Sequence, residues 1–103
     1  MIDEKCIDEC LACVKACEIC IDGCLGGDAK MEACLRACLD CSDLCSITAK
    51  LEARNSAFAS KLKALCAEAC EACAKECEKH ADHHDHCKAC AEACRKCAEA
   101  CRS

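Results

Sequence analysis

Cysteine occupies the positions that a helical protein normally fills with large apolar side chains. Along four stretches of the chain, cysteines recur at gaps that alternate between four and three residues, and polar or alanine residues fill most of the positions between them. The gaps average about 3.5 residues, so on a helix the cysteines form one narrow stripe. In a heptad repeat, Leu, Ile or Val occupy these positions. The pattern predicts four helices with sulfur on their buried faces. The nineteen cysteines are Cys6, Cys10, Cys13, Cys17, Cys20, Cys24, Cys34, Cys38, Cys41, Cys45, Cys66, Cys70, Cys73, Cys77, Cys87, Cys90, Cys94, Cys97 and Cys101.

Helix-breaking residues are confined to a few places, which sets the limits of these helices. The chain has no proline, and its three glycines, Gly23, Gly26 and Gly27, lie close together around Cys24, where we expect them to end the first helix. Asp3, Asp28, the pair 55–56 and Asp82 are suited to cap the four helix N-termini. Because short connections join antiparallel neighbours, we predict an all-α, antiparallel up-down-up-down four-helix bundle with a cysteine-lined core, forming one domain over residues 1–103. The predicted helices span about 3–24, 29–53, 56–79 and 83–101.

The composition does not provide an ordinary apolar core. More than half of the residues are hydrophobic, but 20 of them are alanine and 19 are cysteine, and Phe58 is the only aromatic residue. Each large aliphatic side chain contributes ~1.5–3 kcal/mol on burial, against ~1–2 kcal/mol per residue for backbone ordering. A marginal metal-free fold is therefore expected, and metal bound to thiolates would add its binding free energy to folding. Alanine in the repeat Ala-Glu-Ala-Cys, at 67–70, 91–94 and 98–101, either permits close helix approach or is simple helix-forming filler.

The ligand type narrows the choice of metal. Thiolates are soft ligands that select Cu(I), Zn(II) or iron–sulfur clusters over harder ions. Structural zinc sites use separate quartets, whereas here each helix offers a continuous column in which neighbouring turns lie ~5–6 Å apart, close enough to share metals. Cu(I) accepts two or three thiolates, so sharing leads toward one copper per cysteine with the charges cancelled. The thiols should be neutral before loading, and each cuprous ion should displace one proton.

Three functions are consistent with this pattern of cysteines. The leading hypothesis is a store or buffer of multiple Cu(I) ions without catalytic turnover. The second is a zinc or mixed-metal thiolate buffer of the metallothionein type. The third is a structural or redox-sensing thiol bundle without metal. No single cysteine stands apart as a nucleophile, so the chain is not expected to be an enzyme.

Charge and sequence features exclude several partners. The formal net charge is −5, no basic stripe is present, and no aromatic side chains are available for base stacking, so no nucleic acid partner is expected. No apolar run is long enough to cross a membrane, and the acidic N-terminal residues do not resemble a secretory signal. We therefore expect a cytoplasmic protein. Its expected partners are copper ions and a copper chaperone or acceptor protein that would deliver or receive them.

The two ends of the predicted bundle differ in chemistry. Continuing the cysteine registers at one end reaches Met31, His80 and His83, which are soft or borderline Cu(I) ligands, and we predict that metal enters and leaves there, with His84 and His86 as looser accessories. A solvated polar loop is the alternative for these histidines. At the opposite end the registers reach no soft ligand, and large apolar residues are expected to form a hydrophobic plug. The expected plug comprises Leu44, Ile47, Leu51, Phe58, Leu62 and Leu65, and the registers there reach Asp3, Thr48, Glu52, Ala59 and Lys63.

A second apolar set follows the cysteines of the first two helices by one position. We interpret it as ordinary core between these helices, and a self-association surface is the alternative. The set comprises Ile7, Leu11, Val14, Ile21, Leu25, Leu35 and Leu39.

The cysteine columns on four helices, together with the segment His-Ala-Asp-His-His-Asp-His-Cys at 80–87, closely resemble the bacterial copper storage proteins of the Csp family. The resemblance covers essentially the whole chain. It implies a four-helix bundle that stores many Cu(I) ions on core thiolates, assembles as a homotetramer, and, in members without a signal peptide, is cytosolic. It also implies that the histidine-rich segment lies at the open end of the bundle.

Overall fold

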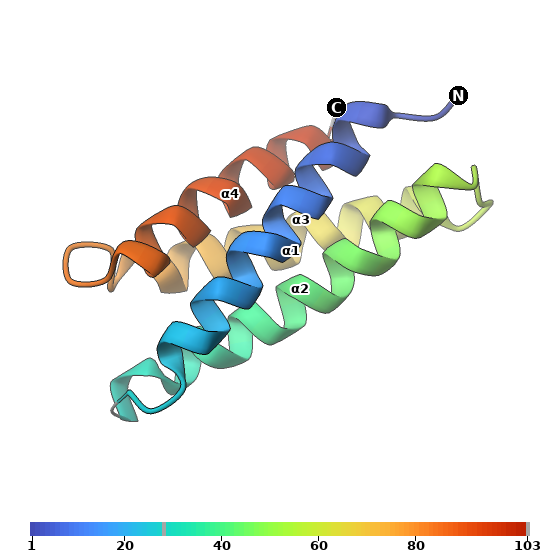
Figure 1. Cartoon of the computed structure of the whole chain (residues 1–103). Helices are drawn as coiled ribbons and strands as arrows, with labels where there is room; N and C mark the ends of the chain where they lie inside the picture. Colours follow the sequence, from blue (N-terminus) through green and yellow to red (C-terminus); the bar gives the residue numbers. More distant parts are fainter. Residues whose placement is uncertain (28, 103) are drawn as a thin grey trace.

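The computed structural model describes residues 1–27 and 29–102. Its elements are α1 (Glu4–Cys24), a 3-10 turn η1 (Ala29–Met31), α2 (Glu32–Ala53), α3 (Ala59–Glu78) and α4 (Asp85–Arg102). Each helix packs against the next one in the chain and α4 packs back against α1, giving a bundle 43 Å long (Figure 1). The predicted all-α, up-down-up-down four-helix bundle is confirmed.

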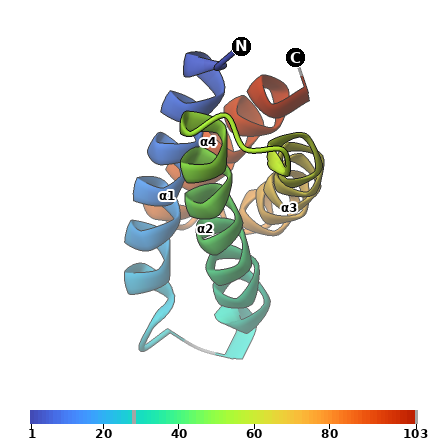
Figure 2. The same ribbon diagram turned by 90° about the vertical axis from the view of Figure 1, so that its right-hand side faces the viewer.

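The connections divide the bundle into two ends. The α1–α2 and α3–α4 connections lie at one end, which we call the histidine end because it carries residues 80–86 (Figure 1). Both termini and the α2–α3 connection lie at the opposite end, which we call the terminal end, and Figure 2 shows the same separation from the side. The sequence predicted soft metal ligands at the first of these ends and large apolar residues at the second.

The predicted start of the first helix is confirmed. Asp3 is the N-cap of α1, and its Oδ1 accepts a hydrogen bond from the backbone N–H of Cys6 at 3.0 Å. This bond satisfies one of the amide groups that the first turn leaves without a helical partner. The second predicted cap, Asp28, lies outside the described residues.

The second, third and fourth helices begin later than predicted. α2 starts at Glu32 rather than 29, because Ala29–Met31 form the 3-10 turn η1. α3 starts at Ala59 rather than 56, because Ser56 Oγ accepts from the N–H of Phe58 at 3.1 Å and so stabilises a turn. Asn55 before it has a φ of 52°, a left-handed conformation that asparagine tolerates and that separates this turn from α2. α4 starts at Asp85 rather than 83, because residues 81–83 form a turn.

Sulfur forms the core of the bundle, as the spacing predicted. All nineteen cysteines are buried, and only Cys24 and Cys101, at opposite ends of the column, retain any solvent exposure, 5% each. Four alanines next to cysteines belong to the same buried cluster and so permit close packing rather than act as exposed filler. They are Ala67, Ala74, Ala91 and Ala98.

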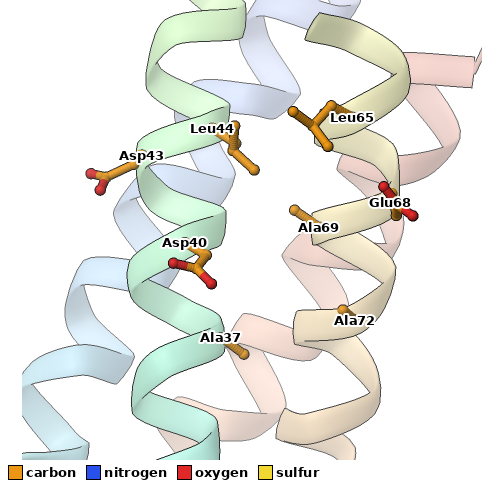
Figure 3. Close-up of a pocket in the computed structure, with 8 residues that line it drawn as sticks. All are labelled: Ala37, Asp40, Asp43, Leu44, Leu65, Glu68, Ala69 and Ala72. Atoms are coloured by element: carbon orange, nitrogen blue, oxygen red, sulfur yellow. The ribbon is translucent and has the colours of Figure 1, made fainter.

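The predicted hydrophobic plug is wrong. Leu44 and Leu65 point toward the space between α2 and α3, where they line a groove of about 630 Å³ on the side of the bundle together with Ala37, Ala69 and Ala72 (Figure 3). Ile47, Phe58 and Leu65 are exposed, and Leu44, Leu51 and Leu62 are only partly buried. These residues lie beside the cysteine register and not in it, so they face outward from the column.

Polar residues close the terminal end instead. Glu52 is 6% exposed and accepts a hydrogen bond from the backbone N–H of Asp3 at 2.8 Å, while Lys63 Nζ lies 3.3 Å from Asp3 Oδ2 and 3.9 Å from Glu52 Oε1. We call Asp3, Glu52 and Lys63 the polar clasp. The hydrogen bond from Cys6 lowers the pKa of Asp3, so the carboxylate is ionised. Thr48, which is fully buried, donates to the carbonyl of Leu62 at 3.4 Å.

The apolar set of α1 and α2 divides between core and surface. Ile7, Val14, Ile21 and Leu35 are partly buried against the core cluster, which agrees with the favoured interpretation. The other members are exposed and are available to a partner surface. They are Leu11, Leu25 and Leu39.

Candidate metal centre

The sulfur atoms form a continuous network along the bundle. Neighbouring Sγ atoms lie 3.5 Å apart at the terminal end, between Cys6 and Cys101, and 3.6 Å apart toward the histidine end, between Cys34 and Cys77. Between these ends, Cys41 Sγ lies 3.6 Å from Cys70 Sγ. These contacts join different helices, so a metal ion bound by two or three neighbouring thiolates would crosslink the bundle.

Groups of four sulfurs lie within 4.8 Å of one another at several levels. The sequence did not show separate quartets, because their members come from different helices. Three of the groups named below take one cysteine from each helix, and several share members, so neighbouring metals would share thiolates. The groups include Cys10/Cys45/Cys66/Cys97, Cys13/Cys45/Cys70/Cys97, Cys13/Cys17/Cys41/Cys94, Cys17/Cys73/Cys90/Cys94 and Cys20/Cys38/Cys77/Cys90.

Burial keeps the thiols at the two ends of the column protonated. It raises the pKa of Cys6 and of Cys24 to about 11, and that of Cys87 to about 12, from an ordinary value of 9.0. Inside the column, a hydrogen bond from Cys17 lowers the pKa of Cys13, and the same pairing raises the pKa of Cys17. Metal binding to the end thiols must therefore displace protons at neutral pH.

A histidine reaches the sulfur network at the histidine end. His86 Nδ1 lies 3.3 Å from Cys20 Sγ and 3.5 Å from Cys87 Sγ. The His86 ring also lies beside that of His84, with 5.2 Å between the centroids. An imidazole nitrogen between two thiols is a borderline donor positioned to receive an incoming soft ion.

Gly23 makes room for this histidine. A Cβ atom at residue 23 would lie 2.5 Å from Cδ2 and 2.6 Å from Nε2 of His86, closer than atoms can approach. Gly23 lies within α1 and does not end the helix. The left-handed turn after α1 is supplied by Gly26, with a φ of 81°. The sequence predicted that all three glycines end the helix, and the contact between Gly23 and His86 was not foreseen.

The other residues predicted for this end occupy different environments. Met31 is 5% exposed and belongs to the same buried cluster as the cysteines. His80 is partly buried in the turn after α3, and its carbonyl accepts from the amides of His83 and His84. His83 and His84 are exposed.

His86 contacts the sulfur network and His83 is exposed, and this difference has a structural cause. Counting four residues back from Cys87 to His83 assumes that α4 is already helical there, but the helix begins at Asp85. His86 directly precedes Cys87 and would normally point away from the cysteine stripe. The open space over Gly23 lets its ring turn back toward Cys20, a contact between α4 and α1 that spacing within one helix does not reveal.

No helix among the described residues meets the length and apolarity needed to span a bilayer.

Proteins similar to this chain include a cysteine-rich protein and solved structures of copper storage proteins. A Bacillus subtilis protein, the uncharacterized cysteine-rich protein YhjQ, is 45% identical over 102 residues, which cover 97% of this chain and 93% of the relative. The solved structure of the Cu(I)-bound copper storage protein BsCsp3 is 43% identical, with a TM-score of 0.91 over 99% of this chain and 96% of that one.

A second solved structure extends the similarity to another genus. The copper storage protein Ccsp from Streptomyces lividans, loaded with 10 copper equivalents, is 40% identical, with a TM-score of 0.93 over 97% of this chain and 80% of that one. The profile of the family described as copper storage protein matches residues 2–103. Since the match spans nearly the whole chain and includes every column of cysteines, the chain belongs to the copper storage protein family.

Proposed function

We propose that this chain stores multiple Cu(I) ions on the thiolates of its core, with a capacity of about one ion per cysteine. The observation that carries the proposal is the continuous network of buried sulfurs. Groups of four sulfurs that could each hold a metal ion have cysteines in common with neighbouring groups. Sharing lets each thiolate bridge two ions, so the charge of the cuprous ions balances that of the thiolates. The copper-loaded relatives from two genera support the same assignment.

The proposal predicts the binding stoichiometry. Anaerobic titration with Cu(I), in competition with a chelator of known affinity, is expected to reach about 19 ions per chain, with about one proton released per ion. A zinc buffer would instead saturate at about four ions, since each tetrahedral site takes four thiolates. Metal analysis after gel filtration distinguishes the two, and saturation at a few ions of either metal would contradict copper storage in the shared network.

We further propose that copper enters and leaves at the histidine end. Met31, His80 and His83 remain the candidate ligands from the sequence, and His86 joins them because its Nδ1 already contacts Cys20 and Cys87. In this scheme His86 passes an ion to the first two thiolates of the column. The exposed His83 and His84 would bind incoming ions before these ions reach His86.

Filling the space over Gly23 tests this route. Gly23→Ala is expected to displace the His86 ring and to slow Cu(I) uptake about as much as His86→Ala does, while α1 gains helix propensity worth about 1 kcal/mol. Stopped-flow absorbance in the thiolate-to-copper charge-transfer region measures the rate, and metal analysis measures the unchanged capacity. Ile19→Ala, at an exposed position one turn before Gly23 on α1, is the control and should take up copper at the wild-type rate. Equal uptake rates in wild type and both His86-displacing variants would exclude a role for His86.

Location and assembly are proposed from the relatives and from the surface. A Streptomyces lividans relative is described as cytosolic, and we propose the same location for this chain. The exposed apolar side chains of Leu11, Leu25 and Leu39 support assembly into a homotetramer. A copper chaperone or acceptor protein would donate or receive ions at the histidine end, and no catalytic role is proposed for any residue.

A further inference from the structure

A cavity at the terminal end leads to the sulfur network far from the histidines. It has a volume of about 380 Å³ and lies between α3 and the end of α4, lined by Ser60, Lys63, Ala64, Ala67, Cys101 and Arg102. Cys101 is one of the two thiols that are not fully excluded from solvent. Its Sγ lies 3.5 Å from that of Cys6 and 3.7 Å from that of Cys10. A small molecule in the cavity would therefore meet the end of the column and not an isolated cysteine.

The charges around this cavity favour an anion. Among the described residues, the charged side chains that line it are Lys63 and Arg102. Lys63 is positioned by the polar clasp, and Arg102 is positioned by Glu71, but none of these carboxylates lines the cavity. At the histidine end, by contrast, charges of both signs flank the histidines, since Asp82 and Asp85 lie between Lys79 and Lys88. An anionic ligand is therefore favoured at the cavity, where the charged lining residues are Lys63 and Arg102.

We propose that this cavity is a second port, at which a small anionic thiol removes Cu(I) from the terminal end of the column by ligand exchange. The inference rests on the proposed storage function. It assigns Cys101 and Cys6 as the exchanging ligands and Lys63 and Arg102 as the groups that attract the incoming thiol. The port differs from the histidine end in taking a ligand that carries its own sulfur.

The exchange balances without any change of oxidation state. The sulfur of an incoming thiol bonds to an ion held by Cys6 and Cys101, the copper–Cys101 bond breaks, and the thiol proton passes to Cys101. A second thiol displaces Cys6 in the same way and gives Cys6 its proton. The ion leaves bound to two incoming thiolates, and its two-coordinate copper–sulfur centre keeps the single negative charge that it had between Cys6 and Cys101, in addition to the charges that the incoming thiols carry. During the exchange copper is bound by three sulfurs, and negative charge accumulates around it. Lys63 and Arg102 beside the cavity stabilise this charge.

The cavity can be blocked without altering any cysteine. Ala64 is exposed at its rim, so Ala64→Trp should fill it, and Ser60→Glu should reverse its electrostatic preference. Ala72 is also an exposed alanine of α3, but it lines the groove toward α2, and its variants Ala72→Trp and Ala72→Glu are matched controls. The experiment uses full-length protein loaded with Cu(I), freed of excess metal and mixed anaerobically with excess glutathione. Ultrafiltration at intervals gives the rate at which copper leaves the protein.

Ala64→Trp is expected to slow release to glutathione and to neutral 2-mercaptoethanol about fivefold, whereas Ser60→Glu slows release to glutathione alone. Both controls should release copper at the wild-type rate. Equal release from Ala64→Trp and Ala72→Trp at wild-type copper content would overturn the port and leave storage intact. Equal slowing of both thiols by Ser60→Glu would overturn the role of the two cations. Failure of the wild-type protein to load Cu(I) would overturn storage as well.

Discussion

Loading with Cu(I) is expected to raise the midpoint of thermal unfolding by roughly 20 °C or more. Without metal, the core consists of thiols in weak contact at 3.5–4.0 Å and of alanine, with few large side chains. A ligand that binds only the folded state at a thousand times its dissociation constant adds about 4 kcal/mol, and about 1 kcal/mol shifts the midpoint of a chain this size by roughly 4–8 °C. Far-ultraviolet circular dichroism of copper-free and loaded protein, both kept anaerobic, measures the shift.

The position of a cysteine in the network should determine how much it contributes to the copper-dependent rise in the midpoint of thermal unfolding. Cys41 Sγ lies 3.6–3.9 Å from sulfurs on α1, α2, α3 and α4, so Cys41→Ala should remove ligands from several ions at once. Cys24 lies at the end of the column and is the matched control. The copper-dependent rise should shrink more in Cys41→Ala than in Cys24→Ala. Equal midpoints for copper-free and loaded wild type would show that the metal does not crosslink the helices.

The fold was predictable because one type of residue defines every buried stripe. The gaps between cysteines give the helix faces, and the polar caps and glycines give the connections, so the bundle and the burial of all nineteen cysteines follow from the sequence. Asp3 caps α1 as its place before the first cysteine stripe predicts, and the same carboxylate also lies 3.3 Å from Lys63 Nζ. The start of α3 was misplaced by three residues because Ser56 caps a turn as readily as a helix.

Contacts between helices were not predictable in the same way. Leu44 and Leu65, which were expected to plug the terminal end, lie outside the cysteine register and face the α2–α3 groove (Figure 3). Glu52 and Lys63 instead continue the register and join Asp3 in the polar clasp. The spacing of residues along one helix does not reveal which polar residues of different helices will meet. The same limit concealed His86, whose contact with Cys20 depends on the missing side chain of Gly23.

The copper-free bundle is expected to unfold as the pH rises from about 9 to about 11. In the unfolded chain, the thiols of Cys6, Cys24 and Cys87 ionise near 9.0, whereas burial raises their pKa values in the folded state to about 11, 11 and 12. The folded state therefore keeps protons that the unfolded state releases. Their stabilising effect is complete below pH 9 and is lost as the pH rises through the folded-state values.

The expected size of this loss is large relative to the stability of the domain. At about 1.4 kcal/mol per pKa unit, Cys6 and Cys24 account for about 3 kcal/mol each and Cys87 for about 4 kcal/mol. Their sum is comparable with the roughly 5–15 kcal/mol that typically separates folded from unfolded domains. Circular dichroism against pH, under anaerobic conditions, measures the transition. Copper-loaded protein is the control: it carries the same lysines, but its thiols have already lost their protons to metal, so its helical signal should persist to higher pH. Copper-free protein that keeps full helicity at pH 11 would show that the buried thiols ionise without unfolding the bundle.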